Sequence, residues 1–239
     1  MNKDHQKLVG KTECFVKEQL RDAEGGHDWW HIDRVRKTSL AIAEGENIDL
    51  TVLELGALLH DIADPKFHDG DEEVGPRTAV DWLKLLDLDR KSIEHIEKII
   101  RNISYKNSFE DQAFNSKELQ IIQDADRLDA IGAIGIARTF NYGGHKGFEL
   151  YNPEIDPVNF KSKEDYKKSN APTINHFYEK LLLLKDKMNT KKGKEMAQQR
   201  HDFMLKFLEQ FYFEWDPSAP SRTSRGKGLN TPPSFGHLP

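Results

Sequence analysis

Apolar residues recur at intervals of three and four along most of the chain, the spacing that places them on one face of an α-helix. Little of the sequence alternates between apolar and polar positions as a half-buried strand would. The fold class predicted from this pattern is all-α, a bundle of helices. The predicted helices span roughly residues 5–22, 28–45, 50–62, 78–87, 89–101, 116–140, 173–188 and 193–214.

Three stretches interrupt the helical pattern. Residues 64–77 combine proline and glycine with charges and predict a loop, and residues 141–172 predict an irregular excursion of the kind that often covers a site. After Trp215 the chain is rich in proline, serine and glycine, which predicts a disordered tail over 216–239. Since no internal repeat is visible, one helical domain over residues 1–215 is the simplest partition.

Two glycines, Gly132 and Gly135, fall inside the long helix predicted over 116–140. A glycine in a helix interior costs up to about 1 kcal/mol relative to alanine. We therefore expect another backbone to approach closely at these positions, where a larger side chain would not fit.

The composition narrows the class of protein. A hydrophobic content of 37% in 239 residues is enough for a core, and a net charge of only −5 among 31% charged residues predicts no broad cationic surface for nucleic acid. Cys14 is the single cysteine, which excludes an internal disulfide framework and a cysteine zinc cluster and fits a reducing compartment. No segment approaches the roughly 20 apolar residues of a membrane span, and the start MNKDHQKLVGKTECF does not resemble a signal peptide. We expect a cytoplasmic protein without a membrane partner; its oligomeric state is left open.

Candidate chemistry begins with His60 and Asp61, which follow the apolar run LELGALL. An imidazole and a carboxylate beside buried surface are both metal ligands, although a lone doublet of this kind at a helix end is more often a cap and a surface ion pair. The preceding helix carries HDWWHIDRV, where His27, His31 and Arg34 are spaced by four and three residues. These spacings put the three side chains on one helical face.

A group of acids lies in or just before a later apolar helix, in QDADRLDAIGAIGIAR, at Asp124, Asp126 and Asp129. An unpaired carboxylate is expensive to bury, and either a metal ion or an arginine relieves that cost. Pairing with Arg127 and Arg138 therefore stays open as the structural alternative.

Taken together, the order of these motifs resembles the HD superfamily of metal-dependent phosphohydrolases, named for its His-Asp doublet. The segments HDWWHIDRV, LLHDIADPKF, DADRLDAIGAIGIARTF and TINHFYEKLLLLKDKMNT are similar to those of a bacterial group of uncharacterised HD-domain hydrolases, and the resemblance extends over about residues 5–215. It implies an HD-domain helical bundle in which four residues bind the metal, and it makes His27 a neighbour of the ligands or a substrate-facing residue. The implied ligands are His31, His60, Asp61 and Asp126.

Two imidazoles and two carboxylates favour one divalent ion, with Mn2+ preferred to Mg2+ and with Fe2+, Ni2+ and Co2+ as further candidates. Members of the superfamily with two metals carry additional histidines between the doublet and the last aspartate. Here that interval holds only His68 and His95, and Ile103 stands where a related histidine is often found. We therefore expect a single ion.

A divalent ion lowers the pKa of its bound water and polarises a phosphoryl oxygen, so the predicted reaction is hydrolysis at phosphorus. Asp61 and Asp64 are the predicted catalytic residues. If the helix continues, Asp64 lies about one turn beyond His60 and Asp61, where it could hold or deprotonate the attacking water. An exposed residue before Pro65 is the competing interpretation of Asp64. The residues predicted to contact substrate, chosen for charge or position beside the motifs, are Arg34, Lys66, His27, Arg127, Arg138 and Tyr142.

The resemblance also implies the substrate class, a small-molecule nucleotide or phosphate ester. Cleavage of nucleoside or deoxynucleoside triphosphates to monophosphate and pyrophosphate is the first hypothesis, and a nucleoside 5′-monophosphatase or other phosphomonoesterase is the alternative. A nucleotide-binding sensor with an idle site is a hypothesis of another class. A plain helical bundle with histidines in its core is the last, and it requires the motif order to be accidental.

Overall fold

The computed structural model describes residues 3–21, 28–63, 71–103, 114–158 and 170–218. All regular secondary structure within these ranges is helical, which confirms the all-α prediction. The chain forms two compact units, Met1–Asp126 and Arg127–Pro239. The single domain predicted over 1–215 stays a prediction.

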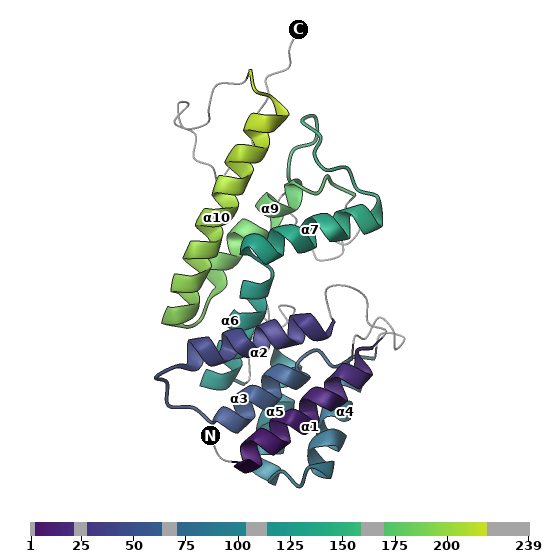
Figure 1. Ribbon diagram of the computed structural model, residues 1–239, viewed down its shortest axis with the longest axis vertical. Helices are drawn as coiled ribbons and strands as arrows, with labels where there is room; N and C mark the ends of the chain where they lie inside the picture. The colour runs from purple at the N-terminus through teal and green to yellow at the C-terminus, as the bar shows by residue number, and fades with distance from the viewer. Residues whose placement is uncertain (1–2, 22–27, 64–70, 104–113, 159–169, 219–239) are drawn as a thin grey trace. The chain divides into compact units, whose positions relative to one another are not determined.

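The first unit is built around a buried helix, α3 (Leu50–Leu59), and Figure 1 shows it among the other helices of this unit. Every residue of α3 from Val52 to Leu59 is buried, as expected of a helix that is apolar on nearly all sides. It packs against α1, α2 and α5, and α4 packs against α5. The bounds of these helices are α1 Lys3–Gln19, α2 Trp29–Ala43, α4 Val74–Leu85 and α5 Arg90–Asn102, and α6 (Lys117–Asp129) carries the chain out of the unit.

Aspartate side chains start three of these helices by accepting hydrogen bonds from first-turn amides. Asp28 caps α2, Asp89 caps α5, and Asp49 caps α3 by accepting from the amides of Thr51 and Val52 at 2.9 and 3.1 Å. Such caps satisfy amides that have no partner inside the helix. The local sequence therefore determines where α2 and α3 begin. These two helices position the candidate histidines, His31 in the first turn of α2 and His60 directly after α3.

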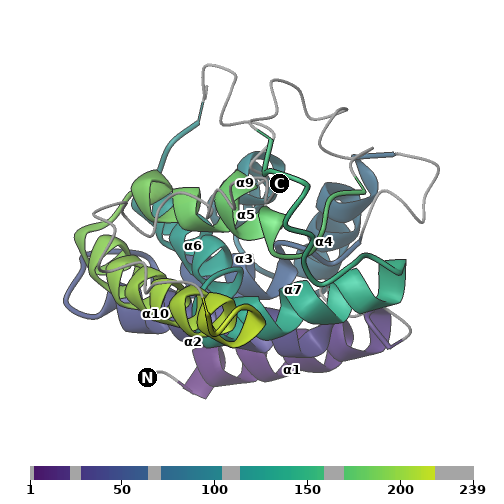
Figure 2. The same cartoon turned by 90° about the horizontal axis from the view of Figure 1, so that it is seen from above.

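The second unit consists of α7 (Gly132–Lys146), α9 (Asn175–Glu179), the 3-10 helix η3 (Leu181–Lys187) and α10 (Lys191–Trp215). Helix α10 packs against both α7 and η3, and Figure 2 shows α7 and α10 crossing one another. Between them lies a cluster of aromatic rings in which Phe207 stacks on Phe177, with ring centroids 5.8 Å apart. Of the apolar stripe predicted along 193–214, Met204, Leu208 and Tyr212 are buried in the core, whereas Phe203 is 49% exposed.

One predicted helix, over 116–140, is wrong as a continuous element. The helix is interrupted at Ala130 and Ile131. Helix α7 starts at Gly132, whose φ of +77° is a left-handed conformation that interrupts a helix and suits glycine. The expected close backbone approach occurs at Gly135, where a Cβ would collide with the carbonyl of Ala130. At Gly132 a Cβ would instead meet the side chain of Arg200.

Other boundaries differ as well. Helix α7 continues to Lys146 through a stretch predicted to be irregular. Helix α4 begins at Val74 and not at the predicted residue 78; Pro76 lies in its first turn, where proline is tolerated. The helix predicted over 173–188 is divided into α9 and η3 at Lys180, whose φ and ψ of −144° and −56° are not helical. The predicted disordered tail lies, beyond residue 218, outside the described residues.

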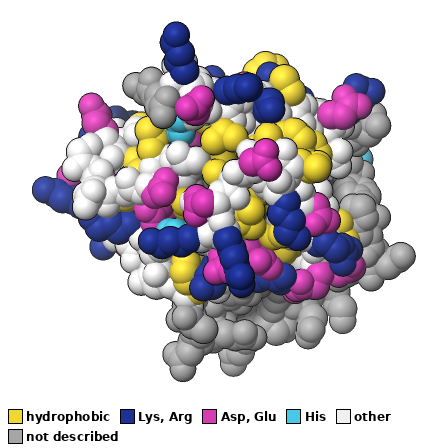
Figure 3. Space-filling view, turned by 90° about the horizontal axis from the view of Figure 1, so that it is seen from below, with side chains coloured by type: hydrophobic (Ala, Val, Ile, Leu, Met, Phe, Trp, Pro, Cys, Tyr) yellow, Lys and Arg dark blue, Asp and Glu magenta, His cyan; other side chains and the backbone are white. Residues whose placement is uncertain are grey.

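None of the helices in the described part of the chain combines the length and apolar character needed to cross a bilayer. Figure 3 shows positive and negative side chains interspersed over the face in view. This mixture on that face agrees with the nearly balanced charge of the sequence.

Candidate metal centre

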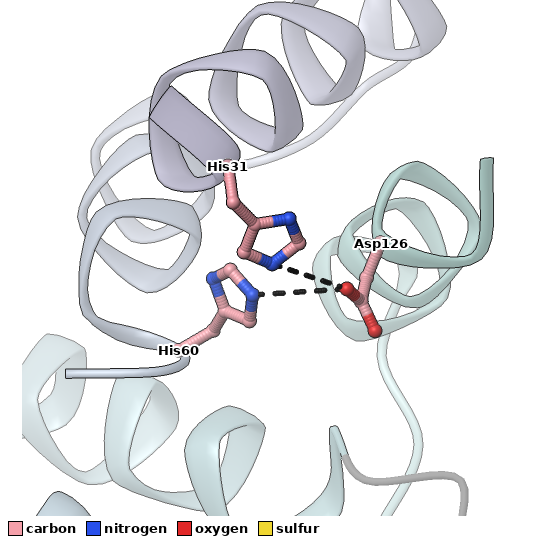
Figure 4. A group of neighbouring side chains, drawn as sticks. All are labelled: His31, His60 and Asp126. Carbon is pink, nitrogen blue, oxygen red and sulfur yellow. Dashed lines mark ion pairs between the residues drawn. The ribbon is translucent and has the colours of Figure 1, made fainter. Parts of the chain in front are cut away.

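Three helices of the first unit bring His31, His60 and Asp126 together (Figure 4). His31 lies in the first turn of α2, His60 directly follows α3, and Asp126 lies near the end of α6. One ligand atom from each residue lies within 4.8 Å of the other two. Residues separated by up to 95 positions in sequence therefore converge on one point, as the resemblance to the HD superfamily implied for these three.

The two imidazoles face one oxygen of the carboxylate. His31 Nε2 lies 3.4 Å and His60 Nε2 lies 4.0 Å from Asp126 Oδ1, and the two ring centroids are 5.4 Å apart. The histidine side chains are each 3% exposed, whereas that of Asp126 is 40% exposed. The centre is thus enclosed on the imidazole side and accessible to solvent at the carboxylate.

The His60 ring is oriented by its own helix. Its Nδ1 lies 2.8 Å from the carbonyl oxygen of Ala57, an acceptor, so Nδ1 carries the proton and donates. Nε2 is then a free lone-pair donor, and it is buried without a hydrogen-bond partner among the described residues. This is the arrangement by which a backbone carbonyl fixes the tautomer of a metal-binding histidine.

Electrostatics keep His60 in the form that binds metal. Burial lowers the pKa of His60 below its ordinary value. The Asp126 carboxylate opposes this shift most strongly, the neighbouring His31 lowers the pKa further, and Asp61 raises it, but burial outweighs the rest. The imidazole is therefore neutral near neutral pH. Only a neutral imidazole offers its lone pair to a metal ion.

His31 is positioned by the start of its helix. The side chain of Asp28 accepts a hydrogen bond from the His31 amide at 2.9 Å, which makes His31 the third residue of α2. The ring is 3% exposed and points at Asp126. The cap therefore anchors the backbone that carries this ring.

Asp61, the remaining predicted ligand, lies outside the group of three. It is partly buried next to His60, and its charge acts on that ring. Its role as a ligand stays a prediction. Arg34 lies on α2 one turn beyond His31 and is partly buried, so its predicted contact with phosphate also stays a prediction.

Three predicted site residues, His27, Asp64 and Lys66, lie outside the described residues. His95, considered for a second metal, has its Nε2 2.9 Å from Ser116 Oγ and 3.6 Å from a Glu118 oxygen. Among the described residues, only one group of histidine and acidic side chains converges as a metal site would, and His95 is not part of it.

The remaining predicted substrate residues belong to the second unit, where each has an observed neighbour. Arg127 donates to the carbonyl of Lys187 at 2.6 Å, and Arg138 donates to the buried carboxylate of Asp129 at 2.5 Å. Tyr142 is 55% exposed on α7, with its ring 6.3 Å from that of Phe148. For Arg138 the structural alternative, pairing with an acid of the motif, is present; the roles of all three toward substrate stay predictions.

The side chains of His31, His60 and Asp126 are suited to bind a divalent ion. Two neutral imidazoles and a carboxylate are the ligand types that Mn2+, Fe2+, Ni2+, Co2+ and Zn2+ accept. The buried Nε2 of His60 has no other use among its described neighbours, and leaving such an atom without a partner is costly. The side chains present therefore fit a metal ion.

Sequence reasoning did not identify the groups that hold these ligands in place. The contact of His60 with the Ala57 backbone carbonyl cannot be predicted from the pattern of side chains in the sequence. Asp28, by contrast, had a signal, because an aspartate three residues before His31 at the start of a predicted helix is a typical N-cap.

Comparison with known proteins places these features in a family context. A family model of the HD domain matches residues 29–131, from the start of α2 to the break after α6. The uncharacterised protein YpgQ of Bacillus subtilis is 38% identical over 209 residues, which cover 85% of this chain and 92% of YpgQ.

Solved structures show the same similarity. The crystal structure of an HD-superfamily hydrolase from Bacillus thuringiensis has 43% identity and a TM-score of 0.71, covering 89% of this chain and 98% of that chain. The crystal structure of YpgQ in complex with ADP has a TM-score of 0.69 and, in the structural alignment, 33% identity; it covers 90% of this chain and 98% of YpgQ.

Proposed function

The chain belongs to the HD superfamily of hydrolases, and from that membership we propose that it is a metal-dependent phosphohydrolase acting on nucleotides. The proposed reaction cleaves nucleoside and deoxynucleoside triphosphates to the monophosphate and pyrophosphate. The observation that supports it most strongly is the convergence of His31, His60 and Asp126 around a buried ring nitrogen with no hydrogen-bond partner in the described structure.

The proposed ligands are His31, His60, Asp61 and Asp126, holding one divalent ion, with Mn2+ preferred because two imidazoles suit a transition ion better than Mg2+. One ion rather than two is proposed because the sequence between the doublet and Asp126 holds only His68 and His95 as further histidines. When bound, such an ion supplies Lewis acidity toward a phosphoryl oxygen and lowers the pKa of water.

In the proposed reaction a water oxygen forms a bond to the α-phosphorus while the bond from that phosphorus to the bridging oxygen breaks, which releases pyrophosphate. Asp61 and Asp64 are proposed to orient the water and take its proton. Arg34, Lys66 and His27 are proposed to face the phosphates, where a guanidinium or ammonium offsets their charge. The 40% exposure of the Asp126 side chain provides an open side at which substrate can reach the centre.

The choice of a nucleotide is supported by the YpgQ structure, which contains ADP. That observation concerns YpgQ, and it reaches this chain through their similarity of fold and sequence. Triphosphate cleavage and monophosphate cleavage both accord with a nucleotide-binding relative, so the products must decide between them.

The test is a screen of nucleoside triphosphates, nucleoside monophosphates and simple phosphate esters with Mn2+, Mg2+, Ni2+ and Co2+, with product identification. We expect dATP to give dAMP and pyrophosphate, fastest with Mn2+, and His60→Gln to abolish turnover. Release of orthophosphate from dAMP instead would identify a monophosphatase. Metal binding without turnover of any ester would identify a nucleotide sensor, and failure to bind metal would leave only the helical bundle.

A further inference from the structure

Glu54 is a charged residue in the middle of the apolar helix α3, and it is only 1% exposed. An ionised carboxylate at such a position is stable only when its oxygens are paired. Its partners come from both neighbouring helices, α1 and α2.

Each oxygen of Glu54 has its own partner. Arg36 of α2 donates to Oε1 from Nε at 2.8 Å and from Nη2 at 2.7 Å, and it also reaches Glu13 of α1 through Nη1 at 2.8 Å. His5 of α1 lies with Nε2 2.5 Å from Oε2. The cluster His5–Arg36–Glu54 therefore connects α1, α2 and α3 through buried and partly buried hydrogen bonds.

The hydrogen bonds of His5 are fully accounted for. An ionised carboxylate can only accept, so Nε2 of His5 donates to Glu54. Nδ1 lies 3.0 Å from Thr51 Oγ1, whose hydroxyl can donate to it. Both ring nitrogens of His5 therefore have hydrogen-bond partners, and the cluster has a defined geometry.

This cluster lies on the two helices that deliver the histidines of the metal centre. Arg36 follows His31 by five residues on α2, and Glu54 precedes His60 by six residues on α3. At the helical rise of 1.5 Å per residue these separations are roughly 8 and 9 Å along the helix axes. A helix segment of this length is rigid, so the placement of α2 against α3 at the cluster determines the distance between the two imidazoles.

We propose that the His5–Arg36–Glu54 cluster is a brace that sets the spacing of His31 and His60 and thereby the affinity for the divalent ion; the inference rests on the proposed function. Arg36, Glu54 and His5 are positioning residues in this account. Helix α1 lies outside residues 29–131, the range that matches the HD family model. The brace makes the metal centre depend on a helix beyond the matched domain.

The test measures metal affinity apart from turnover. Mn2+ is titrated by calorimetry into the full chain after removal of metal by a chelator, for wild type and Arg36→Lys. Lysine keeps the charge and loses the planar fork that holds Glu54 and Glu13 together. We expect Mn2+ binding to weaken by about tenfold, the lower end of the loss seen when groups that orient metal ligands are removed.

The matched control is Arg90→Lys, which alters an exposed ion pair with Glu94 on α5 and should leave Mn2+ affinity unchanged. If Arg36→Lys does not fold, His5→Gln carries the same test from the other end of the brace. A variant with a lowered melting temperature and wild-type Mn2+ affinity would overturn the brace alone. A wild-type chain that binds no Mn2+ would overturn the proposed function, and the brace with it.

Discussion

Gly56 is the residue whose substitution most directly probes the packing beneath the metal centre. A Cβ added at Gly56 of α3 would lie 3.0 Å from Ile122 Cδ1 of α6, and its other neighbours, on Ile99, would be at ordinary contact distances of 3.6 and 3.7 Å. Gly56 precedes His60 by four residues and Ile122 precedes Asp126 by four, so the contact lies one helical turn below the centre.

Two opposing effects determine the stability of Gly56→Ala. Alanine gains up to about 1 kcal/mol over glycine in a helix interior, whereas crowding a packed core costs about 1–3 kcal/mol. We therefore expect a net loss of about 0–2 kcal/mol. Ile122→Val removes the methyl group that would be crowded and alone costs about 0.5–1.5 kcal/mol. In the double variant the new methyl group occupies the space of the old one, so the two changes should couple favourably by about 1 kcal/mol or more.

The assay is urea denaturation followed by far-ultraviolet circular dichroism, in the presence of a chelator so that metal binding does not contribute to stability. Gly10→Ala is the matched control, because Gly10 lies on α1 with nothing within 4 Å of an added Cβ, and it should be stabilised by up to about 1 kcal/mol. Strict additivity of the two core changes, or a Gly56→Ala variant as stabilised as Gly10→Ala, would refute the reasoning.

Three further predictions concern stability. Burial, with a contribution from nearby Lys180, lowers the pKa of His176 from 6.5 to about 3. Between these pH values unfolding takes up a proton, so the free energy of unfolding falls as the pH drops, by up to about 1.4 kcal/mol per pH unit. The stability of His176→Gln should depend less steeply on pH over this range, and an equal dependence would contradict the assignment. Asp49→Ala removes two first-turn hydrogen bonds of α3 and should lower the free energy of unfolding by about 1 kcal/mol. Asp81→Ala, which removes an exposed carboxylate inside α4, is the control and should cause no such loss. Arg138→Met removes the guanidinium that pairs with the buried carboxylate of Asp129 and should cost about 3 kcal/mol by urea denaturation; unchanged stability with a raised substrate KM would show instead that Arg138 serves the substrate.

The candidate centre was predictable because its chemistry leaves a local mark in sequence. His31 lies near the start and His60 near the end of a predicted helix, next to apolar residues, and Asp126 interrupts an apolar stretch, so each is conspicuous among its neighbours in the chain. Their convergence was implied by the resemblance of the motifs to those of the HD superfamily. The all-α class followed from periodicity, because a buried helix such as α3 shows a long apolar run bounded by a clear cap.

Features that depend on tertiary contact were not predictable in the same way. Helical periodicity continues across Ala130 and Gly132, and only the left-handed backbone of Gly132, packed under Arg200, ends one helix and starts the next. The pairing of His5 with Glu54 joins residues 49 positions apart, which spacing rules for a single helix cannot indicate. A lone glutamate inside an apolar helix was nevertheless a signal that a buried partner had to exist.

Calorimetric titration of Mn2+ into chelator-treated wild type and Asp126→Ala shows whether His31, His60 and Asp126 hold a divalent ion. Asp81→Ala, which removes an exposed carboxylate of α4, is the control. We predict one Mn2+ per chain for wild type and for Asp81→Ala, and a loss of measurable binding for Asp126→Ala. Wild-type affinity in Asp126→Ala, or no binding by wild type, would contradict the account.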